Sequence, residues 1–203
     1  MTEKESLDEV QTKLVRLGLS FAQKGWHPGG FGGFAVKGDQ GVISTKEGAN
    51  FEALLPEDFG NKIFSPLGEA LLASDEVGAV LHIYHLDALL CADRDESRGF
   101  THFSDLSILE KLSKNKELAL NAPVLKVDRE KELAPQLEEA LSGESEDIEK
   151  APCVNLLGDG LFVFGTDLKE AQRATEILAS LFSYSYRRPM NPKRAAKVSG
   201  FQL

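Results

Sequence analysis

The chain has 203 residues, of which 42% are hydrophobic and 27% charged, so one globular domain with a real core is expected rather than two. Its formal net charge of -9, without a dense Lys/Arg block, argues against a nucleic-acid partner. Two cysteines, a polar acidic N-terminus and no apolar run of about 18 residues predict a cytoplasmic protein without disulfides, signal peptide or membrane span.

The first half of the chain alternates between helical and extended patterns. Apolar residues at helical spacing predict a first helix, and a glycine-rich stretch at 25–33 ends it. Two apolar runs around a Gly-Asp-Gln-Gly turn are typical of a β-hairpin. The elements expected here are a helix at 7–24, a hairpin at 34–44, a short turn or helix from 56 to 59, a helix at 66–74 and a buried strand at 77–86.

The second half continues this mixture without a strict strand–helix–strand alternation. We expect a helix at 104–114, a strand at 122–127, a helix at 133–141, a solvated loop at 142–152, two strands within 153–165 and a long helix at 168–186. Such a pattern predicts an α/β protein of the α+β type, in which helices pack over the faces of a sheet. The expected domain spans 1–186, and 187–203 is a basic, proline-broken C-terminal tail.

His82, Tyr84 and His85 lie close together in the apolar run VLHIYHL at residues 80 to 86. In a strand, residues two apart share a face, so His82 and Tyr84 point one way and His85 the other, unless the strand has ended. A His-x-His pair binds metals well, but the second position is Tyr, a poor zinc ligand because its pKa is near 10. From the residues alone, His82 is either a structural histidine or a metal ligand.

Other candidates have a structural explanation beside a functional one. Asp159, in the Gly-Asp-Gly turn at 158–160, either serves the hydrogen bonding of the turn or is an oxygen ligand. The glycine-rich stretch at 25–33 could cradle a phosphate with its backbone N–H groups, although it is neither a P-loop nor a G-x-G-x-x-G motif. Glu69 and Asp105 each lie near a predicted helix start, where the helix dipole favours a carboxylate in any case.

The order of several motifs is more specific than any one of them. GWHPGGFGGFAVK, PEDF, PLGEALL, GAVLHIYH, FTHFSDL and LLGDGLFVFGTDLKEA follow one another between about residues 10 and 186, nearly the whole chain. This order resembles the class II aldolase/adducin family, and within it the methylthioribulose-1-phosphate dehydratases of methionine salvage. GWHP and the pattern G-x-x-V-x-G-x-x-x-x-E-A are the most specific pieces.

The resemblance implies a class II aldolase-like three-layer sandwich, whose central and mostly antiparallel sheet is flanked by helices. Members usually form tetramers with the active site at a subunit interface, so a homo-oligomer is expected. They bind a divalent metal, generally zinc, through three histidines; the metal polarises a substrate carbonyl while a carboxylate moves the proton. A glycine-rich loop and a Ser-Gly pair hold the phosphate of a small phosphorylated sugar.

Matched position by position, the metal ligands are incomplete. His82 matches the first metal histidine, whereas Tyr84 falls where the second should be and Asp159 where the third should be. This set, with His85 as a further donor if the strand ends at Tyr84, could hold iron or manganese, since oxygen-rich sites suit harder ions, or it could hold no metal.

The substrate-binding positions match in part. The expected phosphate loop keeps Gly32 and Gly33, and Glu47-Gly48 stands where Ser-Gly is expected. Gly48 therefore matches, but Glu47 places a negative charge beside the expected phosphate. At roughly 4 Å that repulsion costs one to several kcal/mol, depending on the dielectric.

Two carboxylates match catalytic positions of the family. Glu69 matches the base of aldolase members, and Asp105 lies near the acid/base carboxylate of the dehydratases, shortened by one methylene. Two functions stay open. The chain is either a metal-dependent lyase acting on a small phosphorylated sugar, or a catalytically degenerate relative that serves as an oligomeric interaction module. Fold alone cannot decide between them.

Overall fold

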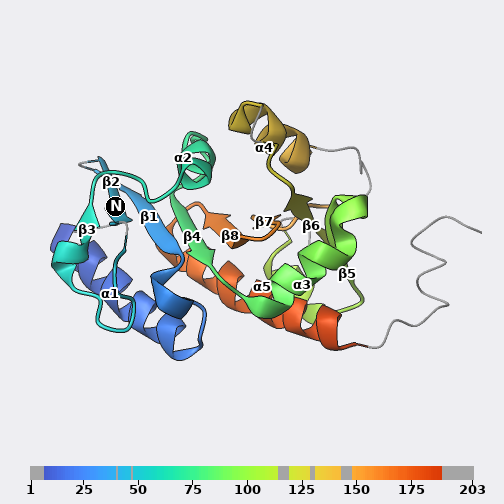
Figure 1. The fold of residues 1–203 in the computed structure, drawn as a ribbon, viewed down its shortest axis with the longest axis horizontal. Helices are drawn as coiled ribbons and strands as arrows, with labels where there is room; N and C mark the ends of the chain where they lie inside the picture. Colours follow the sequence, from blue (N-terminus) through green and yellow to red (C-terminus); the bar gives the residue numbers. More distant parts are fainter. Residues whose placement is uncertain are drawn as a thin grey trace, which may run out of the picture.

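A single mixed sheet runs through the computed structural model, which describes residues 7–39, 41–46, 48–113, 119–128, 131–142 and 148–188. Its 8 strands follow the order β3-β2-β1-β4-β8-β7-β6-β5 (Figure 1). Neighbouring strands are antiparallel except β6 and β7, which are parallel. The strands are β1 (Gly33–Gly38), β2 (Gly41–Thr45), β3 (Phe59–Gly60), β4 (Ala79–Ile83), β5 (Phe100–Ser104), β6 (Ala119–Leu125), β7 (Cys153–Leu156) and β8 (Gly160–Gly165).

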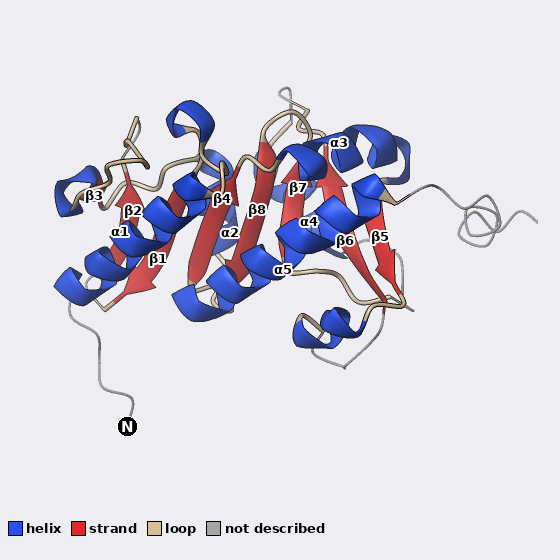
Figure 2. Cartoon of the chain, turned by 90° about the horizontal axis from the view of Figure 1, so that it is seen from below, coloured by secondary structure: helices blue, strands red, loops and turns tan. Residues whose placement is uncertain are grey.

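Helices cover both faces of the sheet (Figures 1 and 2). One face packs against α1 (Leu7–Gln23), α3 (Leu86–Asp95) and α5 (Leu168–Arg187), and the other against α2 (Pro66–Leu72) and α4 (Leu133–Ser142). Short 3₁₀ helices complete the described chain: η1 (Pro28–Gly30), η2 (Pro56–Asp58), η3 (Glu96–Arg98) and η4 (Ser107–Lys111). The predicted three-layer α/β architecture with a mostly antiparallel sheet is therefore confirmed.

Strand β4 lies at the centre of both cores, because successive side chains of a strand point to opposite faces. Leu81 and Ile83 join the cluster under α1, α3 and α5, while Val80 joins the cluster under α2 and α4. His82 follows Val80 in this alternation and lies against Phe162 and Phe64 on the α2 side. The imidazole thus lies on the face of the sheet opposite to α5.

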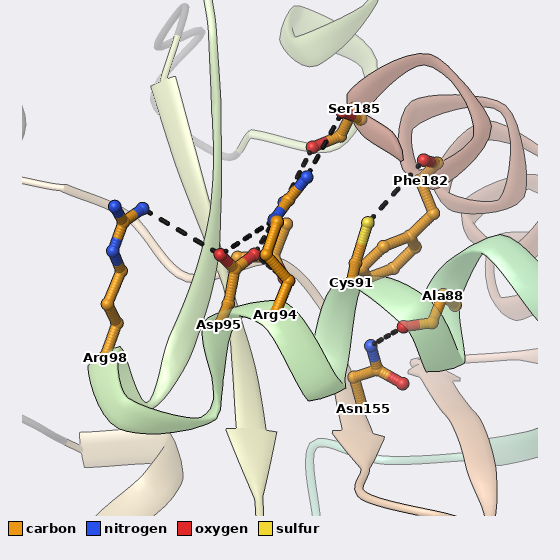
Figure 3. A network of polar contacts seen from close by, with 9 residues as sticks. Ala88, Cys91, Arg94, Asp95, Arg98, Asn155, Phe182 and Ser185 are labelled. Atoms are coloured by element: carbon orange, nitrogen blue, oxygen red, sulfur yellow. Dashed lines mark hydrogen bonds and ion pairs between the residues drawn. The ribbon is translucent and has the colours of Figure 1, made fainter. Parts of the chain in front are cut away.

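An ion pair between exposed Arg94 and buried Asp95 joins α3 to its neighbours on the other face (Figure 3). Asp95, which is 2% exposed, accepts hydrogen bonds from Arg94 Nε at 3.0 Å, Arg94 Nη2 at 2.7 Å and Thr101 Oγ1 at 2.9 Å. The Arg94 guanidinium also donates to the Ser185 carbonyl and hydroxyl in α5. These contacts fix the end of α3 against α5 and β5.

Two predicted elements differ from the structure. The strand predicted at 77–86 ends at Ile83, because α3 begins at Leu86 with His85 as its N-cap. The helix predicted at 104–114 is replaced by the end of β5 and the 3₁₀ helix η4, while residues 114–118 lie outside the described part. Most of the predicted basic tail, 189–203, also lies outside it. Among the described helices, none combines the length and apolar character that crossing a bilayer requires.

Candidate functional site at the end of strand β4

Three segments that carry candidate residues meet at one end of the sheet. Strands β1 and β8 both pair antiparallel with β4, with Gly33 beside His82 and Leu161 beside Ile83. The glycine-rich loop before β1 and the hairpin turn before β8 therefore lie next to the end of β4. This is the arrangement that the resemblance implies for a metal and phosphate site.

His82 makes its hydrogen bond to backbone at this point. Its Nε2 lies 2.8 Å from the carbonyl oxygen of Asp159, and since a carbonyl only accepts, Nε2 carries the hydrogen. The imidazole stacks on Phe162 with ring centroids 3.9 Å apart and planes 11° apart, and Phe64 lies nearly parallel at 6.1 Å. Burial lowers the pKa of His82, against the raising effect of Asp159, so the ring is neutral.

Protein side chains fill the space next to the Cα atoms of the two glycines expected to hold phosphate. Gly32 has φ +109°, and a Cβ there would overlap the His27 ring and lie 2.6 Å from the His82 carbonyl oxygen. A Cβ on Gly33 would overlap the ring of Phe64. Glycine is thus required at both positions for packing of the protein against itself.

Gly48 lies on a neighbouring loop and faces open space. A Cβ on Gly30 would approach the Ala49 carbonyl oxygen to 3.2 Å, so the loop that contains Gly48 reaches the glycine-rich segment. Gly48 itself has φ +76°, and a Cβ at this position would meet no atom within 4 Å. Of the glycines predicted to bind substrate, Gly48 is exposed, Gly32 half-exposed and Gly33 buried; Glu47 beside Gly48 lies outside the described residues.

His27 is a second buried imidazole at this end of the sheet. Its Nδ1 donates to the Phe31 carbonyl at 2.7 Å, and its ring stacks on Phe51 with centroids 3.8 Å apart. Its buried Nε2 has no hydrogen-bond partner among the described residues. Burial lowers the pKa of His27 to about 4, with a smaller lowering from His82, so it is a neutral packing residue at physiological pH.

Tyr84 and His85 turn away from His82 because β4 has ended. His85 Nδ1 accepts a hydrogen bond from the Ala88 backbone N–H at 3.3 Å and so caps α3. Tyr84 lies 6.1 Å from Phe31 between ring centroids. Both line a groove of about 980 Å³ whose other wall belongs to α5, on the sheet face opposite to the His82 ring. The structure therefore does not bring His85 together with His82.

The two predicted catalytic carboxylates lie in different places. Glu69 is exposed on α2, which starts two residues after Phe64 and covers the same face as His82. Asp105 follows β5, at the edge of the sheet and at the end opposite to His82. Four strand spacings separate β5 from β4, which is about 19 Å. Within one chain, Asp105 is thus remote from His82.

These donors do not fit a three-ligand metal centre in the arrangement described. The Nε2 of His82 is directed at a backbone oxygen, and His85 serves a helix cap on the other face. Across the described ranges, no three His, Cys, Asp or Glu side chains come together as metal ligands would. Tyr84 packs beside Phe31 and supplies no third donor near His82.

Sequence reasoning missed the aromatic residues that occupy this site. Phe162 is the register partner of His82 across β4 and β8, so the hairpin that carries Asp159 also carries the ring that stacks on the imidazole. The aromatic character of β8 was a signal for this packing. Phe64 lies in a loop with no regular pattern, and nothing local marks it as the cover of Gly33.

Comparisons with known proteins agree with this architecture. No protein-family model matches the sequence. A methylthioribulose-1-phosphate dehydratase from Bradyrhizobium sp. (strain BTAi1 / ATCC BAA-1182) is 25% identical over 190 residues, which cover 84% of this chain and 87% of the relative. Its similarity along most of both chains agrees with the resemblance seen in the motifs.

Solved structures show the same fold at lower identity. YgbL from Escherichia coli superposes with a TM-score of 0.65 at 18% identity, covering 92% of this chain and 94% of that one. L-fuculose-1-phosphate aldolase from Thermus thermophilus gives a TM-score of 0.63 at 18% identity, covering 95% and 97%. The chain therefore has the class II aldolase fold and is similar over most of its length to a methylthioribulose-1-phosphate dehydratase.

Proposed function

We propose that this protein is a non-catalytic member of the class II aldolase fold that acts as a homo-oligomeric interaction module. The observation that carries the proposal is the closed end of β4. His82 donates to the Asp159 carbonyl, and the His27 and Phe64 rings fill the space that a side chain on Gly32 or Gly33 would take. The His82 nitrogen expected to bind a metal is thus bonded to the chain itself, and Gly33 is buried beside Phe64, whereas Gly32 stays half-exposed.

An exposed apolar patch supports association with further copies of the chain. Phe31 and Leu86 are 61% and 64% exposed; the Tyr84 ring contacts Phe31, and Tyr84 and Leu86 line the same groove. Clustered exposed apolar side chains mark interaction surfaces in soluble proteins. The patch lies at the end of β4, where the family resemblance implies that subunits meet.

Metal content tests the non-catalytic proposal. Elemental analysis of the protein purified without chelator should find no stoichiometric zinc, iron or manganese, and the melting temperature should not change with EDTA. The protein should not turn over methylthioribulose 1-phosphate above the buffer rate. One metal ion per chain that is lost in His82→Ala would overturn the proposal.

Solution mass tests the oligomeric part. Light scattering after gel filtration should show a mass above that of one chain, and Leu86→Asp should reduce it, because a charge cannot be buried in an apolar contact without a partner. Ile108→Asp is the matched control, since Ile108 is 40% exposed on η4, away from the patch. Equal effects of the two variants would contradict an interface at the patch.

A metal-dependent lyase acting on a small phosphorylated sugar is the second candidate. It is favoured by similarity to a methylthioribulose-1-phosphate dehydratase over 84% of the chain, and by the meeting of the glycine loop, the Gly48 loop and the Asp159 hairpin. It requires a rearrangement that frees His82 Nε2 from the Asp159 carbonyl. Glu69, on the helix that covers the same sheet face as His82, would then be the carboxylate that moves a proton, whereas Asp105 could act only from another subunit.

Substrate turnover distinguishes the second candidate. Methylthioribulose 1-phosphate and L-fuculose 1-phosphate are incubated with protein loaded with zinc, iron or manganese, and products are followed by NMR. Turnover that is lost in Glu69→Gln, while the variant keeps its melting temperature, would establish the lyase. No turnover under any of these conditions supports the non-catalytic proposal.

A further inference from the structure

A second groove lies at the opposite end of β4, between α1 and α5. Its volume is about 700 Å³. Helices α1 and α5 both lie on the same side of the sheet (Figure 2). Residues of α1, of the turn after β1, of the start of β4 and of the first turn of α5 line the groove. The charged residues among them are Lys13, Arg16, Lys37, Asp39, Asp167 and Lys169.

The sheet register separates this groove from the candidate site. Val36 pairs with Ala79, and Ala79 pairs with Gly165, so the end of β1, the start of β4 and the end of β8 lie together. His82, at the other end of β4, does not line the groove. A ligand in the groove would therefore be bound independently of the residues discussed above.

The groove is positively charged in a chain whose net charge is -9. The lysine and arginine side chains that line it outnumber the carboxylates. Asp167 is engaged as the N-cap of α5, where its side chain accepts from the Glu170 N–H at 2.7 Å. Lys37 donates to the Ser74 carbonyl at 2.7 Å. Arg16 and Lys169 have neither an ion pair nor a side-chain hydrogen bond with any residue that the structure describes.

Arg16 and Lys169 come from different helices, and both line the same cavity. Two cations without a partner among the described residues, one from each helix of the groove, can both contact one anionic group, and Arg matches phosphate and carboxylate with two parallel N–H donors. Close to them the lining is apolar, with Leu17 and Val36 buried and Leu168 half-buried. The groove thus offers a charged rim beside an apolar wall.

We infer that this groove binds a small organic anion, a phosphate monoester or carboxylate attached to an apolar group. Its volume lies in the range of about 300 to 1,000 Å³ that small-molecule sites occupy, which favours such a ligand over an extended protein surface. Arg16 and Lys169 hold the anionic group, and Leu17, Val36 and Leu168 contact the apolar part.

Binding of phenyl phosphate, benzoate and inorganic phosphate tests the inference by NMR titration of the ¹⁵N-labelled protein. Phenyl phosphate or benzoate should shift the amide signals of Gly38 and Gly78, which line the groove. Inorganic phosphate should bind at least several-fold more weakly, because it lacks the apolar group. The two organic probes distinguish a phosphate from a carboxylate preference.

Substitutions assign the binding to the two cations. Arg16→Ala and Lys169→Ala should each weaken binding of the preferred probe roughly five- to tenfold, as expected for loss of one exposed charge-assisted hydrogen bond. Arg173→Ala is the matched control, since Arg173 is an exposed cation on α5 that does not line this groove. The Arg173→Ala variant should bind the probe with the same affinity as the parent protein.

Three results would overturn the inference. The first is the absence of any shift at Gly38 and Gly78 with both organic probes. The second is an equal loss of affinity in Arg16→Ala and Arg173→Ala, which would indicate non-specific attraction. The third is inorganic phosphate binding as tightly as the organic probes, which would leave the apolar wall without a role. Melting temperatures of all variants, measured in parallel, show that each is folded.

Discussion

Asp95 and His82 are both buried polar side chains, but different interactions hold them in place. Asp95 is a buried charge that receives hydrogen bonds from Arg94 and Thr101, with Arg98 3.8 Å away (Figure 3). His82 is a buried neutral ring that bonds to one carbonyl and stacks on Phe162. The first cluster is held by charge pairing, the second by aromatic packing.

This difference bears on function, because catalytic centres arrange charged groups toward a reacting molecule. The resemblance to the class II aldolase family predicts catalytic groups of this kind at the end of β4. Here burial lowers the pKa of His27 and of His82, which makes both poor bases. His82 Nε2 is bonded to a backbone carbonyl, and His27 Nε2 has no partner among the described residues. The charged cluster instead joins α3, β5 and α5, where it stabilises the scaffold.

The largest expected effect comes from removing the buried charge. Asp95→Ala leaves the buried Thr101 hydroxyl and one face of the Arg94 guanidinium without their acceptor. Since Arg94 is exposed to water, the cost comes from the buried Thr101 hydroxyl that loses its acceptor and from the space that the buried carboxylate leaves, and we expect a loss of about 2 to 4 kcal/mol in the free energy of unfolding. Urea denaturation at constant m-value measures it.

Asp93→Ala is the control for the charge network. Asp93 is exposed on the same helix, so its replacement should change stability by less than about 0.5 kcal/mol. If both variants lose the same amount, the contacts of Asp95 do not contribute as described, and the contrast between the two clusters fails.

Replacing His82 tests whether the second cluster depends on ring packing. His82→Ala removes a ring that is buried against Phe162 and should cost about 2 to 4 kcal/mol through the cavity it leaves. His82→Phe retains the stack and loses only the donor to the Asp159 carbonyl, at a cost of about 1 kcal/mol. Thermal and urea unfolding measure both. Equal losses in the two variants would show that the polar contact dominates.

The pH dependence of stability should follow the histidines. The folded pKa of His27 is about 4, below its ordinary value of 6.5, so the unfolded chain binds a proton first as the pH falls. Stability is therefore complete above about pH 6.5 and declines toward pH 4; His27 alone should account for about 2 kcal/mol between pH 8 and pH 5. The lowered pKa values of His82 and His85 act in the same direction.

His27→Phe isolates this contribution. The ring can still stack on Phe51, but the hydrogen bond to the Phe31 carbonyl is lost, so stability at pH 8 should fall slightly. Between pH 8 and pH 5 the variant should lose less stability than the parent protein does. An unchanged slope would mean that His27 does not stay neutral in the folded state.

The fold was predictable from local patterns where these are long and regular. The helix predicted at 168–186 corresponds to α5, and the hairpin predicted within 153–165 corresponds to β7 and β8. Helix α3 escaped prediction because its N-cap is His85, not one of the usual Ser, Thr, Asp or Asn signals. The apolar run before it gave no sign that β4 ends at Ile83.

The candidate site was predictable only as a meeting of segments. Motif order placed the end of β4 beside the Asp159 turn, and the 2.8 Å contact between His82 and Asp159 shows that they are adjacent. The partner atom is a backbone carbonyl rather than the carboxylate, which residue identity does not reveal. The cover provided by Phe64 depends on tertiary packing of a loop, so no periodicity could indicate it.

The smallest expected effect concerns the two buried thiols, whose labelling reports local opening of the core on the α5 side of the sheet. Burial raises the pKa of Cys91 to about 11 and also raises that of Cys153, so neither thiolate forms readily and labelling by a disulfide reagent at pH 8 should be slow. Cys91 lies on α3, one turn before Asp95, with its Sγ 3.8 Å from the Phe182 carbonyl oxygen. Asp95→Ala should therefore accelerate labelling of Cys91 by loosening α3 from α5, while His82→Phe should leave it unchanged. Peptide mass spectrometry assigns the labelled thiol. Equal acceleration in both variants would mean that the two clusters open together, and the separation between charge pairing and aromatic packing would then not extend to the dynamics of the molecule.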